Sequence, residues 1–367
     1  MRLSARAAAS LVTAWAAGWF AVMVIGGGSS WPFFVQGAHA LADAHDRVAG
    51  GLHLYAAAPV LQIGPLAFLA VLPLLPAGPA AAMLGWQVLG AAAGLFVVYL
   101  VRGLRPERDR TRLAQAALYF VPVWMFLAVG VVHVDDVLAL LLSVAALRAA
   151  RSGRPWVTGL LLGLAADAKP WALAFAALLL LLPGWRAQLA AVVVLGLVLA
   201  VAWLPFFAGD PHTSAALRYT IENRPVSALR VIGVRDPRTP PWDRPAQLAL
   251  ALALGALAVW RGRWAAIPLL AVAARLVLEP GGNKYYIAGL VVGTLVWDFV
   301  GSRWSSPWWT IAASLGLFLA RWVPMPDAWH GRLLVAFFAA ACVLLLAPAP
   351  ARASAPSELG HAPSPAV

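Results

Sequence analysis

The chain has 367 residues, of which 62% are hydrophobic and 11% are charged. Soluble domains carry roughly 25% charged residues, so this composition excludes a compact soluble protein; the high apolar fraction and the lack of a short repeat also exclude disordered and fibrous classes. A single cysteine, Cys342, excludes a disulfide framework and a multi-cysteine metal site. The net charge of +12 would suggest a nucleic-acid partner in a soluble protein. In a membrane protein, the positions of the basic residues first indicate which side of the membrane each loop faces.

A spanning helix needs about 20 mostly apolar residues. The first apolar segment, 7–25, follows Arg2 and Arg6 and is longer than the roughly 7–15 residues of a cleaved signal, so we expect a retained signal-anchor. The sequence predicts an all-α polytopic membrane protein with about twelve spans (range about 10–13). The predicted segments are 7–25, 80–101, 113–132, 134–150, 156–167, 170–183, 187–207, 246–260, 264–278, 285–300, 307–322 and 331–348.

Residues 59–79 are apolar but contain five prolines, and a proline inside a helix costs about 3 kcal/mol. We expect this segment to be re-entrant or interfacial, which leaves the loop 102–112 with its five arginines on the cytoplasmic side. Both termini then lie inside. The prediction is one transmembrane domain over 1–348, with outer loops 26–79 and 208–245, and a disordered cytoplasmic tail over 349–367. Residues 323–330 are expected to form a short outer loop.

The remaining charges agree with this topology. Fifteen of the 27 basic residues lie on the inner side, whereas 11 of the 15 carboxylates lie outside or near the outer face. The two short segments 156–167 and 170–183 predict a hairpin that starts inside, because a 12-residue helix rises only about 18 Å. Its tip, with Asp167 and Lys169, would lie in the outer part of the membrane, where charge is tolerated only in a wet cavity or a pair. We therefore expect a polar cavity that faces outward.

The candidate site residues all lie on the outer side. They fall into five groups: His39, Asp43, His45, Asp46, His53 and Tyr55; His133, Asp135 and Asp136; Asp167 and Lys169; Arg218, Tyr219, Glu222, Arg224, Arg230, Arg235 and Arg238; and Glu279, Lys284, Tyr285 and Tyr286. Lys169 and Lys284 are the only lysines, and a compact ammonium suits phosphate oxygens. Carboxylates mixed with these cations suit an anionic lipid headgroup and a sugar.

Each group also has a purely structural interpretation. Asp135 could cap the helix that follows it, Asp167 and Lys169 could form an internal ion pair, and Lys284 could snorkel at a helix end. Loop carboxylates such as Asp43 and Asp46, and the arginines of 208–245, could simply be solvated. His133 and Asp136, at i and i+3 on one helix face, could ligate a metal. No further ligand has the required spacing, so a divalent metal is possible but not required, and no cofactor is certain.

The order of these features resembles the GT-C superfamily of membrane glycosyltransferases, in particular the actinobacterial polyprenol-phosphate-mannose-dependent mannosyltransferases. The resemblance rests on FFVQGAHAL and GLHLYAAAPVLQIGPL within 33–66, HVDDVLALLL at 133–142, the segment 151–187 around the hairpin, and NKYY at 283–286. It implies transfer of a hexose, mannose in those enzymes, from a polyprenyl-phosphate donor to a glycolipid or glycan acceptor on the extracytoplasmic side of the plasma membrane.

The resemblance also implies residue roles. Asp43 or Asp46 would act as the general base, Asp135 or Asp136 as the second acidic site, and Lys169, Lys284, Arg218 and Arg224 would bind the donor phosphate, beside His133, Tyr55 and Tyr285 as substrate contacts. The chain departs from the family where an early aspartate is expected before an aromatic pair, because Ser30 stands there. Asp43 or Asp46 would replace it, or the chain would be inactive.

We weigh three functions from these patterns. The first is an inverting glycosyltransferase with lipid-linked donor, membrane lipids and acceptor as partners and no nucleic acid. The second is a transporter or flippase for a lipid-linked or anionic substrate, against which stands the lack of matching halves. The third is a non-catalytic partner in envelope assembly.

Overall fold

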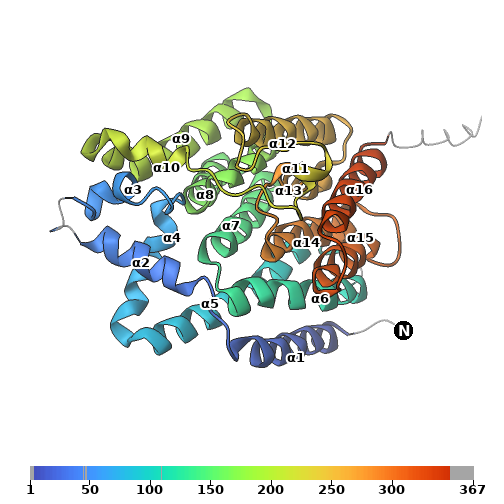
Figure 1. Cartoon of the computed structure of the whole chain (residues 1–367). Helices are drawn as coiled ribbons and strands as arrows, with labels where there is room; N and C mark the ends of the chain where they lie inside the picture. The colour runs from blue at the N-terminus through green and yellow to red at the C-terminus, as the bar shows by residue number, and fades with distance from the viewer. Residues whose placement is uncertain (1–3, 44, 46–47, 109, 348–367) are drawn as a thin grey trace, which may run out of the picture.

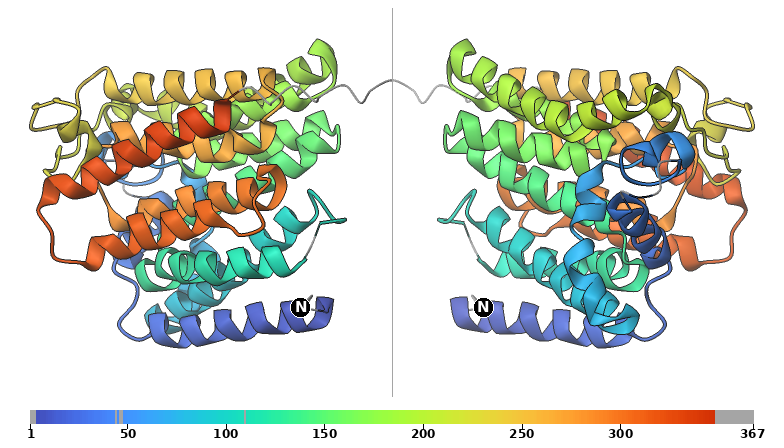
Figure 2. Two further views of the ribbon diagram at one scale, coloured as in Figure 1. Left: turned by 90° about the vertical axis from the view of Figure 1, so that its right-hand side faces the viewer. Right: turned by 90° about the vertical axis from the view of Figure 1, so that its left-hand side faces the viewer.

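The computed structural model describes residues 4–43, 45, 48–108 and 110–347, and within these ranges the chain is helical. The only β-pairing among the described residues is an isolated bridge between Glu222 and Arg238. The prediction of an all-α fold is therefore confirmed. Figures 1 and 2 show the long helices lying side by side. The loop between α9 and α12 gathers at the end of the bundle opposite the start of α1 (Figure 2).

Among the described residues, five helices are long and apolar enough to cross a membrane. They are α1 (Ala5–Val24), α5 (Pro79–Arg102), α6 (Arg110–Met125) with its continuation to Val131, α9 (Gly184–Gly209) and α16 (Asp327–Leu346). The structure thus supports a membrane protein. Of the roughly twelve predicted spans, five are long and apolar enough in the described structure, and the full number stays a prediction. Because α16 begins at Asp327, the expected outer loop 323–330 is shorter than predicted.

The other predicted segments are helical but shorter or more polar at their ends. They form α7 (Val134–Arg151), α8 (Pro155–Ala168), a 3₁₀ helix η4 (Pro170–Leu181), α12 (Asp243–Trp260), α13 (Ile267–Leu278), α14 (Ile287–Val296) and α15 (Trp308–Ile311) with its continuation to Trp322. Helices α8 and η4 form the predicted hairpin and pack against each other and against α7. Their tip carries Lys169 toward the start of α7.

The proline-rich segment 59–79 does not form one long helix. It divides into α4 (Pro65–Leu69) and a 3₁₀ turn η2 (Leu72–Ala77), with prolines at their first turns and one inside η2. This agrees with the cost of proline inside a helix. Helix α4 packs against α2 (Trp31–Ala42), α7 and α8, so the segment contributes to the walls around the hairpin tip. Its re-entrant or interfacial placement stays a prediction.

The loop that follows α9 is tied to the first loop by a half-buried arginine, Arg244. It contains α10 (Ser214–Leu217) and α11 (Ala228–Val231). The Arg244 guanidinium, at the start of α12, donates hydrogen bonds to the Leu217 carbonyl (2.7 Å), the Tyr219 carbonyl (2.6 Å) and the side-chain oxygen of Gln62. One side chain therefore holds two loops that are far apart in sequence.

Candidate active site

The candidate site is built where α6 passes into α7. The last turn of α6 widens to a π-helix (Phe126–Val131), and Val132 then takes a left-handed conformation with φ of 58°. Among the described residues Val132 alone, apart from glycines, has a positive φ. A β-branched residue in this region carries backbone strain, which recurs at functional sites. The strained turn places His133 ahead of the first turn of α7, directly beside Asp135 and Asp136.

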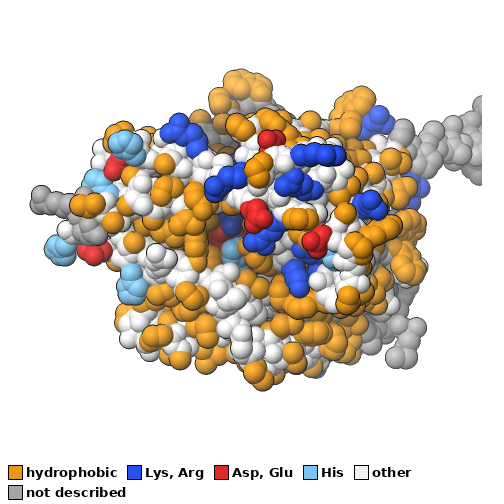
Figure 3. Space-filling view, viewed as in Figure 1, with side chains coloured by type: hydrophobic (Ala, Val, Ile, Leu, Met, Phe, Trp, Pro, Cys, Tyr) orange, Lys and Arg blue, Asp and Glu red, His pale blue; other side chains and the backbone are white. Residues whose placement is uncertain are grey.

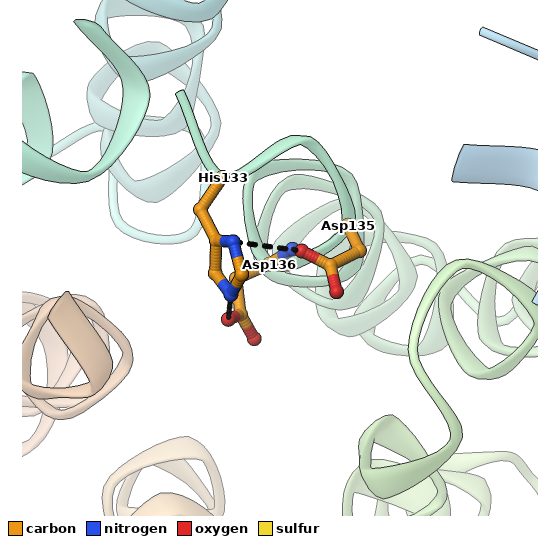
Figure 4. Close-up of side chains that lie close together, drawn as sticks. All are labelled: His133, Asp135 and Asp136. Carbon is orange, nitrogen blue, oxygen red and sulfur yellow. Dashed lines mark hydrogen bonds and ion pairs between the residues drawn. The ribbon is translucent and has the colours of Figure 1, made fainter. Parts of the chain in front are cut away.

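His133, Asp135 and Asp136 form a compact buried group (Figure 4). The His133 Nε2 atom lies 3.1 Å from Asp136 Oδ2, and Nδ1 lies 3.6 Å from Asp135 Oδ1. All three residues are at least nine-tenths buried. The residue at the N-cap position of α7 is His133, and its side chain does not cap the helix. The alternative prediction of Asp135 as the N-cap is therefore wrong.

Lys169 completes this group, which we call the acidic cluster (His133, Asp135, Asp136 and Lys169). Its ammonium donates a hydrogen bond to Asp135 Oδ2 and lies 3.8 Å from Asp136 Oδ2. The sequence left open an ion pair between Lys169 and Asp167, whereas the partner of Lys169 is Asp135. At 13% exposure the Lys169 side chain is the most accessible of the four. An ammonium has three donors, so Lys169 retains hydrogen-bonding capacity after pairing with Asp135.

Aromatic side chains enclose the cluster. Trp171, from η4, donates a hydrogen bond from Nε1 to Asp136 Oδ1 at 2.9 Å. The rings of Tyr285 and Phe34 pack edge-on against the His133 ring, with centroids 4.1 and 5.7 Å away. These rings exclude water, and in a low-dielectric site each charge interaction is stronger than in water. The cluster draws on α2, α7, the hairpin tip and the turn before α14.

Several polar atoms of the cluster lack a hydrogen-bond partner among the described residues. They are both ring nitrogens of His133 and Oδ2 of Asp136, whose ion-pair contacts are not oriented as hydrogen bonds. Buried polar groups are normally paired, so unpaired ones require an explanation. Two carboxylates also face one ammonium. A bound ligand with polar groups would supply the missing partners.

A second buried ion pair extends the network, and the sequence interpretation did not assign it. Arg275, in α13, lies 3.5 Å from Glu279 Oε2, and its guanidinium stacks on the rings of Trp171 and Tyr286 at 4.5 and 4.2 Å. Through Trp171 this arginine is linked to Asp136. The available signal was an arginine inside an otherwise apolar segment, since ionisable residues there are expensive and functional.

The other candidates lie elsewhere. Lys284 stacks its ammonium on Trp322 at 3.8 Å. Arg218 is exposed and donates to the Ser214 hydroxyl, and Arg224 lies 3.7 Å from Glu222 on the surface. Figure 3 shows basic and acidic side chains around a hollow on this end of the molecule, with acidic, basic and histidine side chains recessed inside it.

Asp43, in the first loop, does not enter the cluster. Asp43 is exposed at the C-terminal end of α2, and Asp46 lies outside the described residues. Tyr55 is buried, donates to the Ile63 carbonyl at 2.8 Å, and stacks on Trp203; burial raises its pKa well above the ordinary value. His53 pairs with Asp210 at 3.1 Å, and this hydrogen bond lowers the pKa of Asp210. Asp43, Tyr55 and Asp46 thus stay predictions as site residues.

Gly64 lets the backbone of the first loop pack directly against Asp167 at the hairpin tip. A Cβ at this position would overlap the Asp167 backbone carbonyl and carboxylate. We expect Gly64→Ala to destabilise the protein by about 1–3 kcal/mol, since backbone is a poor neighbour to displace, and to lower any activity of the cluster. Thermal unfolding in detergent measures the loss. Gly196→Ala, in α9 where a Cβ meets nothing within 4 Å, is the matched control; equal effects would contradict this packing role.

The cluster could in principle hold a metal ion. One ligand atom from each of His133, Asp135 and Asp136 lies within 4.8 Å of the others. However, the Lys169 ammonium already lies between the two carboxylates. A divalent cation there would face like charge at short range, so the residues present do not favour a metal.

Comparison with known families places this site in context. The model of glycosyltransferase family 87 matches residues 62–296, which is more than half of the chain. The chain belongs to this family, which is a GT-C-type membrane family. The matched range includes the acidic cluster, the hairpin and the Arg275–Glu279 pair. A search of curated proteins and a search of solved structures found no match.

Proposed function

We propose that the chain transfers a hexose, mannose in the first instance, from a polyprenyl-phosphate donor to a glycolipid or glycan acceptor on the extracytoplasmic side of the plasma membrane. Family membership makes a glycosyltransferase the function class. The observation that carries the proposal is the acidic cluster, in which Asp136 Oδ2 accepts no hydrogen bond and lies 3.1 Å from His133 Nε2 and 3.8 Å from the Lys169 ammonium. A base and a cation side by side are what glycosyl transfer from a phosphate requires.

In this mechanism Asp136 is the general base. Its Oδ2 atom takes the proton of the acceptor hydroxyl, whose oxygen attacks the anomeric carbon of the donor sugar. The bond from that carbon to the phosphate oxygen breaks, and its electron pair leaves with the polyprenyl phosphate. Attack from the face opposite the leaving group inverts the anomeric configuration. Asp136 replaces the loop acids in this role because Asp43 is exposed at the far end of α2 from the Phe34–His133 contact.

Lys169 would act on the leaving group. Its ammonium is held by Asp135, and its remaining donors are available to the phosphate oxygens, on which negative charge grows as the bond breaks. Asp135 is fully buried and serves to position Lys169. His133 and Tyr285 would contact the sugar. The excess negative charge of the cluster also suits the positive charge that develops on the sugar ring in such transition states.

The test of this function is a transfer assay with the full-length protein. Purified protein reconstituted into vesicles is given radiolabelled mannose on polyprenyl phosphate together with membrane lipid extract as acceptor. We expect label to move into a glycolipid or glycan, with release of polyprenyl phosphate. Uptake of the intact donor into the vesicle lumen without cleavage would instead support the transporter, and tight donor binding without turnover would support a non-catalytic partner.

Transfer should not depend on a divalent metal, because Lys169 supplies the positive charge between the two carboxylates. We expect the rate in excess EDTA to match the rate in magnesium or manganese. The measurement is the same label-transfer assay on protein first dialysed against chelator. Loss of transfer in EDTA with recovery on adding manganese would show that a metal, and not Lys169, completes the site.

A further inference from the structure

A second pocket lies beside the acidic cluster without sharing any of its residues. It is bounded by the end of α13, the turn before α14, the end of the α15 continuation, and the start of α16. The space open to the centre of a water molecule is about 20 Å³, and the mouth of the pocket opens to solvent. Tyr286 forms one wall. Its ring packs 4.6 Å from that of Tyr285, which in turn packs 4.1 Å from His133. The rings of Tyr286 and Tyr285 therefore lie between the pocket and the cluster and separate the two.

We call this cavity the Arg321 pocket. At its polar end, Arg321 and His330 have side-chain nitrogens without a hydrogen-bond partner among the described residues. His330 is 9% exposed, and its Nδ1 atom has no hydrogen-bond partner among the described residues. Arg321 donates one hydrogen bond, from Nη2 to the Gly282 carbonyl at 2.5 Å, and has no ion pair within 4 Å in the described part of the chain. The charges of Arg321, Asp327 and Lys284 all act on His330. Glu279, the acid that lines the pocket, is already paired with Arg275.

The other end of the pocket is apolar. Leu317 precedes Arg321 by about one helical turn, and Leu333 and Leu334 follow His330 by about one turn. Leu276 likewise precedes Glu279 by three residues. In α13, the α15 continuation and α16, the polar lining residue thus lies nearer the loops, and the apolar lining residue lies further inside the helix bundle. A charged mouth above an apolar floor fits a phosphate joined to a hydrocarbon chain better than it fits free phosphate.

We propose that the Arg321 pocket binds the phosphate of a second lipid, and that in the reaction proposed above this lipid is the acceptor. The donor phosphate is bonded directly to the carbon under attack, so it must lie at the acidic cluster with Lys169. A phospholipid-linked acceptor differs, because its reacting hydroxyl belongs to a headgroup or glycan that can extend past Tyr286 while the phosphate stays behind. Arg321 and His330, which line the pocket, contact that phosphate. Only the acceptor role rests on the proposed function.

The test measures equilibrium binding to the full-length protein in detergent by native mass spectrometry. The probes are dihexanoyl phosphatidic acid, dihexanoylglycerol as the uncharged lipid, and inorganic phosphate. We expect phosphatidic acid to bind more tightly than either of the others, and Arg321→Gln to weaken it at least about tenfold, as for loss of a charged hydrogen bond. His330→Gln should weaken binding less. Arg332→Gln, an exposed change on the same helix, is the matched control and should leave binding unchanged.

Three outcomes would overturn the assignment. If dihexanoylglycerol binds as tightly as phosphatidic acid, the pocket does not recognise the phosphate. If inorganic phosphate binds as tightly, the pocket does not recognise the hydrocarbon chain. If Arg321→Gln and Arg332→Gln weaken binding equally, the lipid does not bind in this pocket. The double variant Lys169→Met/Asp135→Asn should retain phosphatidic acid binding, since neither residue lines the pocket. If this binding pattern holds while no lipid accepts sugar, the proposed function fails and the pocket stands; if transfer occurs and Arg321→Gln leaves the KM for phospholipid acceptors unchanged, the acceptor role fails.

Discussion

Asp136→Asn should reduce sugar transfer by about 10²–10⁴-fold, the usual contribution of a positioned general base. The amide keeps the size of the side chain and can still accept the hydrogen bond from Trp171, which contacts Oδ1. It cannot take a proton from the acceptor at the position of Oδ2. Initial rates of label transfer from polyprenyl-phosphate mannose, at saturating donor and acceptor, measure the effect. We expect the fall in kcat rather than in KM, because the proton moves only in the transition state.

Glu107→Gln is the control for this variant. Glu107 is an exposed carboxylate in the loop between α5 and α6, and its loss should leave the rate unchanged. Asp43→Asn and Asp46→Asn provide the decisive comparison, because the sequence favours one of these acids as the base. If either of them abolishes transfer while Asp136→Asn retains it, the base lies on the first loop and the role given to Asp136 is wrong.

Lys169→Met should both destabilise the protein and abolish transfer. Removing one partner of a buried ion pair typically costs about 3–5 kcal/mol, because the other charge is left uncompensated. Asp135 is fully buried, so its carboxylate would bear that cost. Thermal unfolding in detergent reports the stability, and the label-transfer assay reports the activity of the fraction that remains folded.

The double variant Lys169→Met/Asp135→Asn separates the two effects. With both charges removed, most of the lost stability should return, since replacing a buried pair by uncharged groups is often neutral. Transfer should stay absent, because no cation is left to stabilise the leaving phosphate. Recovery of transfer along with stability would show that Lys169 is only structural. The exposed variant Arg218→Met serves as a control for the general loss of a positive charge on this end of the molecule.

Much of the local structure could be predicted from the sequence. Each predicted apolar segment is helical, and the prolines of 59–79 divide that segment into α4 and η2. Apolar runs and prolines act over a few residues, so their effects can be predicted from the sequence alone. The hairpin 155–183 was also predicted, because two short runs separated by Asp167 and Lys169 leave few alternatives. The number of membrane crossings was less accessible, since several of the helices are too short to be assigned by length alone.

The pairing of side chains required the tertiary structure. Lys169 could have paired with its neighbour Asp167, and it is the packing of the hairpin against α7 that brings it to Asp135. The sequence also grouped Lys284 and Arg224 with Lys169 as ligands of one phosphate, whereas Lys284 stacks on Trp322 and Arg224 lies beside Glu222. Arg275, Arg321 and His330 were not assigned a role, because their meaning depends on partners from other helices.

The sequence by itself indicated a membrane protein, because it has too few charges for a soluble protein and several long apolar segments. These are properties of the chain as a whole, or of single helices in lipid, and they need no knowledge of contacts. Only the tertiary structure decided which charges meet. An ion pair depends on side chains within about 4 Å of each other, and that proximity is set by how helices far apart in sequence pack together.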